Sequence, residues 1–165
     1  MRRLNAVLYV VALVLACGCV IGGVMVWRAD DTQAQALDTQ SRYGAVQASA
    51  TREAEALLNI SYQDAQASID KVAAGATGKF KKQYARSTDG TIQLLTENKS
   101  VMTGKVIWAG VSSIDADSAS VIAATTGTVA NKQTKNKPVA RNFRLKLDLV
   151  YVDGTWLTDN LEFLS

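Results

Sequence analysis

The sequence has no histidine, and both of its cysteines, Cys17 and Cys19, lie in one apolar run near the N-terminus. Histidine is the usual general base at neutral pH, and together with cysteine it supplies most activated nucleophiles and most transition-metal ligands. The sequence also contains no Gly-rich phosphate loop and no dinucleotide-binding fingerprint. These absences argue against catalysis, and we expect no enzyme activity, no cofactor and no metal.

The apolar run extends from Leu4 to Trp27 without a charged residue. A helix needs about 20 residues to cross the hydrocarbon core of a bilayer, so this run is long enough. Arg2 and Arg3 precede it, which favours an N-terminus that stays in the cytoplasm. We therefore expect a cytoplasmic tail at residues 1–3, a single transmembrane helix at residues 4–27 in the inner (plasma) membrane, and the remainder outside.

A lipoprotein signal is the main alternative for this run. The residues Val-Leu-Ala-Cys at 14–17 approximate the box that precedes an acylated cysteine. However, apolar residues continue beyond Cys19 to Trp27, whereas a cleavable signal has an apolar region of only about 7 to 15 residues. We predict an uncleaved anchor and leave lipidation of Cys17 as the alternative.

The segment after the anchor, residues 28–60, is rich in Ala, Gln and Glu and contains no proline. This composition favours a long helix, which we expect to form an extended stalk. Apolar residues recur on it at spacings near three and four: Leu37, Tyr43, Val46, Ala50 and Leu57. Such a narrow seam packs either on the protein's own domain or, as an alternative, on a second copy of the stalk.

Residues 61–165 have the pattern of one exported α+β domain. Ser61 and Asp64 form a capping pattern for a helix that ends near Gly75. A shorter helix is expected at 79–84 or beyond, with another turn or two over residues 91–98. Four segments rich in Val, Ile, Thr and alternating Leu then predict antiparallel strands, at residues 101–114, 119–130, 141–152 and 156–163. Asp153 and Gly154 occupy a tight turn between the last two.

Three lysines, Lys132, Lys135 and Lys137, lie in the polar segment Asn131–Pro138. A polar loop of this kind is typically solvated, although it is also suited to contact with anionic headgroups or a partner protein. No aromatic residues are interleaved with these bases, so we expect no nucleic-acid binding.

Several segments, taken in order, resemble the Mce-associated membrane proteins of bacteria. They are the anchor with its acidic helix, the segment Tyr62–Tyr84 with its Ala-Thr-Gly-x-Phe motif, and the closing segment Asp153–Leu164 with Asp-Gly-x-Trp-Leu. The resemblance implies a nuclear transport factor 2-like cone, in which helices pack on an antiparallel sheet of about four strands. It also implies an accessory or scaffold protein of an Mce-type complex that imports sterol or fatty acid, with substrate-binding or permease subunits as partners.

The resemblance carries over no catalytic residue, and the residues of interest are structural or interface candidates. Gly78 is expected to permit close approach of a helix end, and Trp156 to plug the base of the cone. The full set is Phe80, Tyr84, Trp108, Trp156, Gly78, Lys132, Lys135 and Lys137.

Three alternative functions remain open at this point. One is a scaffold of a type IV secretion or conjugation machine, and another is a lipid-binding module that uses the cone as a pocket. The third is acid-base catalysis of the ketosteroid isomerase kind, with Asp64 or Asp148 as the base and Tyr62 or Tyr84 as the partner. We disfavour catalysis, because Asp64 is explained as a helix cap and Asp148 alternates with Arg144 and Lys146 on the polar face of its strand.

Overall fold

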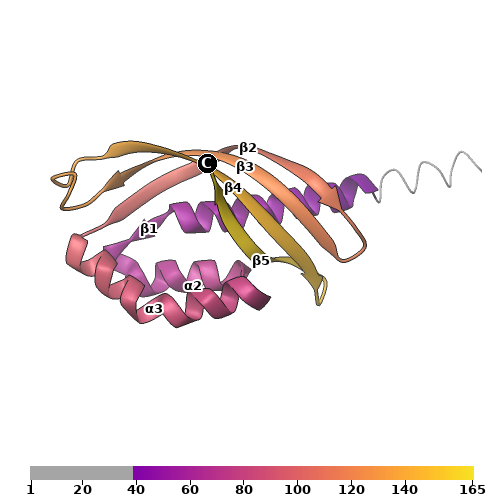
Figure 1. Ribbon diagram of the computed structural model, residues 1–165, viewed down its shortest axis with the longest axis horizontal. Helices are drawn as coiled ribbons and strands as arrows, with labels where there is room; N and C mark the ends of the chain where they lie inside the picture. Colours follow the sequence, from indigo (N-terminus) through magenta and orange to yellow (C-terminus); the bar gives the residue numbers. More distant parts are fainter. Residues whose placement is uncertain (1–38) are drawn as a thin grey trace, which may run out of the picture. The chain divides into compact units, whose positions relative to one another are not determined.

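A curled antiparallel sheet of five strands forms one layer of the fold, and helices cover its concave face (Figure 1). The computed structural model describes residues 39–165. The expected tail and anchor at residues 1–27, and the first part of the expected stalk, lie outside these residues. Within residues 39–165, no helix combines the length and the apolar character that crossing a membrane requires.

The strands pair in sequence order: β1 (Ile60–Ser61), β2 (Val101–Ile114), β3 (Ser118–Ala130), β4 (Val139–Val152) and β5 (Thr155–Leu164). The predicted alternation is confirmed, because Leu145, Leu147 and Leu149 of β4 are buried while the residues between them are half-buried. The predicted turn is also confirmed, with φ of 48° at Asp153 and 83° at Gly154. The expected count of about four strands misses β1, which has only two residues and is too short for a visible period.

Two helices follow β1. A 3-10 turn, η1 (Tyr62–Asp64), leads into α2 (Ala65–Gly75), and α3 (Gly78–Asn98) follows after two residues. The end of α2 at Gly75 is as predicted. The helix expected at 79–84 or beyond and the turns expected at 91–98 form one helix, because α3 is continuous for 21 residues and contains Gly90 in its interior.

The observed capping of this helical segment differs from the pattern expected for Ser61 and Asp64. The Ser61 side chain accepts a hydrogen bond from the Gln63 amide, whereas the Asp64 side chain makes no capping hydrogen bond.

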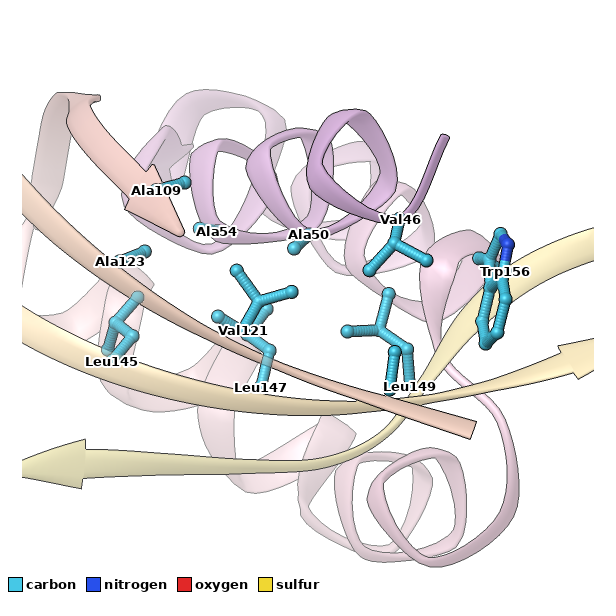
Figure 2. Close-up of a cluster of buried hydrophobic side chains, with 11 residues drawn as sticks. Val46, Ala50, Ala54, Ala109, Val121, Ala123, Leu145, Leu147, Leu149 and Trp156 are labelled. Carbon is cyan, nitrogen blue, oxygen red and sulfur yellow. The ribbon is translucent and has the colours of Figure 1, made fainter. Parts of the chain in front are cut away.

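A further helix runs over residues 39–58, and its part from residue 43 on lies in the hollow of the sheet (Figure 1). Val46, Ala50 and Ala54 are each 0 % exposed and face the sheet, where they meet Val121 and Leu147 in the main core (Figure 2). Alanine on the buried face lets the helix approach the strands closely. The Gln47 amide group also donates a hydrogen bond to the Ala109 carbonyl of β2.

The expected division of the chain at residue 60 therefore needs correction. Residues 43–165 form one compact unit, and the helix over residues 39–58 supplies part of its core rather than standing apart as a stalk. The buried seam also shifts relative to the predicted one. Tyr43 is exposed, while Ala54 and Leu58 are buried, because the contact surface is the curved sheet and not a straight partner.

Two glycines give a matched pair of stability predictions. A Cβ at Gly127 of β3 would collide with the Thr103 carbonyl oxygen and the Gly104 Cα of β2, both backbone atoms, whereas Gly90 in α3 has nothing within 4 Å. We expect Gly127→Ala to lower the free energy of unfolding by more than about 2 kcal/mol. Gly90→Ala should raise it by about 0.5 to 1 kcal/mol, because alanine has the higher helix propensity. Urea unfolding followed by circular dichroism measures both, and equal effects would contradict the predicted close approach of β2 and β3.

Candidate functional site

Glu53 is an acid inside the fold, on the helix over residues 39–58. Glu53 is only 3 % exposed, and its Oε1 atom has no hydrogen-bond partner among the described residues. The carboxyl group lies against Gly75, at the C-terminal end of α2, where a Cβ would collide with Glu53 Oε2. A missing side chain on α2 thus makes the room in which the carboxyl lies.

Burial raises the pKa of the Glu53 carboxyl from 4.5 to about 7, because removal from water disfavours the charged form. The position at the C-terminal end of α2 acts in the same direction, since the partial negative charge of that helix end disfavours an anion. The Glu53 carboxyl is therefore partly protonated near neutral pH, and its protonated form both donates and accepts hydrogen bonds.

Two buried hydroxyl groups accompany Glu53 in the interior. Tyr84 Oη on α3 and Thr158 Oγ1 on β5 have no hydrogen-bond partner among the described residues. Burial raises the pKa of Tyr84, and the negative charge of Glu53 raises it further, which places the two groups within electrostatic reach. Ala76 forms a bridge with Thr158 directly after the glycine that touches Glu53, so α2, α3 and β5 converge on one polar spot.

A cleft of about 440 Å³ opens over Glu53. It lies between the helix over residues 39–58, α2 and the start of β5, and its walls carry both charged and apolar side chains. The residues that line it are Ser49, Arg52, Glu53, Glu55, Ala56, Asn59, Lys71, Ala74, Gly75, Thr155, Trp156 and Leu157.

Four of the candidate residues from the sequence lie near Glu53 or line the cleft. Tyr84 contributes its buried hydroxyl, and Phe80 packs against the Tyr84 ring in a tilted arrangement with 5.7 Å between centroids. Gly78 begins α3 with φ of 45°, and a Cβ there would collide with the Asp159 carboxylate, which accepts a hydrogen bond from the Lys79 amide. Trp156 is 5 % exposed and lines the cleft.

The other four lie elsewhere. Trp108 is 58 % exposed on the outer side of β2, where its ring lies over Gly110. Lys132, Lys135 and Lys137 are exposed in the loop between β3 and β4, which is held to the end of α3 by a hydrogen bond from the Lys132 amide to the Asn98 carbonyl. The structure does not bring these lysines to the cleft.

The acids considered for catalysis are not brought together either. Asp64 is exposed at the start of α2. Partial burial acts to raise the pKa of Asp148, but hydrogen bonds from Ser120, Asn160 and Lys146 outweigh it and lower the pKa overall. Asp148 faces away from the core, beside Leu147 and Leu149, which face into it.

Sequence reasoning missed Glu53, although a signal was present. Glu53 lies three residues after Ala50 and four before Leu57, within the apolar seam. An acid at a seam position predicts a buried carboxyl. Residues 39–165 contain no cluster of three or more side chains suited to hold a metal ion.

Comparison of the sequence with known proteins finds a family match. The family described as "Uncharacterized protein Rv1363c/MT1408-like" matches residues 4–165. The chain is 26 % identical over 164 residues to the uncharacterized protein Rv1363c of Mycobacterium tuberculosis; the match covers 98 % of this chain and 60 % of that relative. The chain thus spans less than two thirds of the relative's length.

Solved structures that are similar in fold include the following two. An IcmL-like type IV secretion system protein from Legionella pneumophila gives a TM-score of 0.59 at 11 % identity, over 72 % of this chain and 88 % of that one. A ketosteroid isomerase-like protein from Erwinia carotovora atroseptica gives a TM-score of 0.53 at 20 % identity, over 74 % of this chain and 96 % of that one. At these identities the likeness shows the fold alone, which is α+β and nuclear transport factor 2-like.

Proposed function

Because the chain belongs to the Rv1363c/MT1408-like family and combines an apolar run at residues 4–27 with a nuclear transport factor 2-like domain, we propose that it is a membrane-anchored scaffold. In this proposal the anchor crosses the inner (plasma) membrane once, and the domain holds partner proteins outside it without catalysing a reaction. Tethering raises the effective concentration of partners in the same membrane, so weak contacts suffice.

The observation that carries this proposal is an apolar surface at the end of β5. Ile107 and Phe163 are each 61 % exposed, and Leu164 is 37 % exposed. They line a surface hollow of about 560 Å³ together with Phe143 and Arg144, and Phe143 packs edge-on against Phe163 at 5.6 Å. Clustered exposed aromatic and aliphatic groups beside an arginine are typical of protein contact surfaces.

We propose Mce-type lipid import as the system, with substrate-binding or permease subunits as the partners. This assignment is supported by the resemblance of the segments at Tyr62–Tyr84 and Asp153–Leu164 to Mce-associated membrane proteins. The second candidate is a scaffold of a type IV secretion machine, favoured by the shared fold of the IcmL-like protein.

Photo-crosslinking in native membranes tests the proposal. A photoreactive amino acid at Phe163 should capture an Mce substrate-binding or permease subunit, whereas the same group at Gln93, exposed on α3, should not. Phe163→Glu should lower copurification of that subunit at least about tenfold, because a charge at the centre of an apolar interface is desolvated on binding. Capture of a secretion component would favour the second candidate, and absence of any adduct from Phe163 would contradict the scaffold surface.

A further inference from the structure

We propose that the cleft over Glu53 is a binding site for a small uncharged molecule that carries a hydroxyl group on an apolar body, with the Glu53 carboxyl as its polar anchor. This goes beyond the scaffold function, which uses the surface at the end of β5 and needs no ligand in the cone. Three observations carry it: an unpartnered carboxyl, a cleft that this residue lines, and a mixture of bases and acids around that cleft.

The first observation is the unpartnered carboxyl. Buried polar groups in folded proteins almost always have a hydrogen-bond partner, and leaving one without a partner costs about 1 to 3 kcal/mol. Glu53 Oε1 has no partner in the described part of the chain, and neither Arg52 nor Lys71 forms an ion pair with it there. The Glu53 carboxyl therefore lowers the stability of the fold and offers its hydrogen-bonding capacity to a ligand.

The second observation is the space over this carboxyl. Small-molecule sites typically enclose about 300 to 1,000 Å³ and combine apolar walls with a few convergent polar groups. The cleft has about 440 Å³, and Ala56, Ala74, Trp156 and Leu157 provide apolar wall. Glu53, from the helix over residues 39–58, and Trp156, from the start of β5, both line this space, so a ligand body beside Trp156 shares the cleft with the carboxyl.

The third observation is charge, which selects an uncharged ligand. Two bases, Arg52 and Lys71, and two acids, Glu53 and Glu55, line the cleft. Bases and acids are mixed around the cleft and the Glu53 carboxyl is partly protonated, so the lining presents no uniform charge for a cation or an anion. A hydroxyl group both donates and accepts, so it pairs with Glu53 whether the carboxyl is protonated or ionised.

Binding of a matched probe series to the full chain in lipid nanodiscs tests this site. The probes are 1-hexanol, hexylamine and hexanoate, which share an apolar chain and differ in the charge of the head group. Replacing Trp27 and Trp108 by Phe leaves Trp156, the third of the three tryptophans, as a fluorescent reporter in the cleft wall. Nanodiscs without protein provide the blank for partition into lipid. We expect a saturable change in Trp156 fluorescence that is strongest with hexanol.

Two substitutions of Glu53 locate the binding. Glu53→Leu removes the anchor at similar volume and should weaken hexanol binding at least about tenfold, the value of one good hydrogen bond. Glu53→Gln keeps a donor and an acceptor and should bind hexanol within about threefold of the unchanged protein. Asp70→Asn, an exposed acid on the outer side of α2, is the matched control and should have no effect. Circular dichroism verifies that each variant is folded.

Three results would overturn the proposal. Tightest binding of hexylamine or of hexanoate would make the site one for ions of that sign. Hexanol binding that Glu53→Leu leaves unchanged would place the ligand away from the carboxyl. The absence of saturable binding by any probe, in folded protein, would remove the site itself.

Discussion

Glu53→Gln should remove a fall in stability that the unchanged protein shows between pH 4.5 and about 7. The ordinary pKa of the carboxyl is 4.5, and burial raises it to about 7 in the folded chain. Between these values the folded chain keeps a proton that the unfolded chain has lost, so the free energy of unfolding decreases as the pH rises. Below pH 4.5 both states are protonated and the burial penalty is absent, whereas above about pH 7 both are ionised and the penalty is complete.

The expected size of the effect is about 2 to 3 kcal/mol, since each unit of pKa shift corresponds to about 1.4 kcal/mol and part of the shift is offset by solvent near the cleft. Glutamine has nearly the same shape and no charge at any pH. The variant should therefore equal the unchanged protein near pH 4.5 and exceed it at pH 8. Urea unfolding at both pH values, followed by circular dichroism, measures the difference.

The control for this prediction is Glu97→Gln, which removes a negative charge from an exposed position on α3. Asp148 also changes stability with pH, because its pKa is lowered in the folded chain, so only the difference between variant and unchanged protein is informative. A difference between Glu53→Gln and the unchanged protein that is the same at pH 4.5 and pH 8 would show that Glu53 reaches water in the folded state.

The elements of the sheet were predictable because their sequence carries a strong local signal. Leu145, Leu147 and Leu149 alternate with polar residues, and Asp153 and Gly154 tolerate positive φ, so one face and one turn follow from residue order. By contrast, β1 has two residues and no period to read. The full length of α3 could not be fixed from the sequence, because Gly90 in its interior is a weak helix former and the packing of α3 on α2 and β5 overrides this preference.

The candidate site was harder to predict, because its parts come from distant segments. Glu53 and Tyr84 come within electrostatic reach, and Ala76 pairs with Thr158 of β5, only in the folded chain. In the sequence, Glu53 is one acid in a helix rich in Ala, Gln and Glu, where most acids are solvated. The room for its carboxyl depends on the absence of a side chain at Gly75, 22 residues later. No local sequence pattern predicts that Glu53 and Gly75 lie against each other.

Trp156→Ala should cause the largest loss of stability that we predict, because Trp156 closes one end of the core. The residue is 5 % exposed, lies beside Val46 and Leu149 in the buried cluster (Figure 2), and packs on the Tyr151 ring with 5.1 Å between centroids. Truncation of a buried tryptophan to alanine costs about 3 to 5 kcal/mol, from lost apolar burial and the cavity that remains. The hydrogen bond from Ser49 Oγ to the Trp156 carbonyl involves the backbone and should persist.

The matched control is Trp108→Ala, which removes the same side chain from a position that is 58 % exposed. Its ring covers Gly110 on the outer side of β2, so its loss should lower the free energy of unfolding by less than about 1 kcal/mol. Urea unfolding of the two variants, followed by circular dichroism, separates a core tryptophan from a surface one. Equal losses would mean that Trp108 is covered in the folded protein, and an unchanged stability of Trp156→Ala would mean that the helix over residues 39–58 does not need this ring to close the hollow of the sheet.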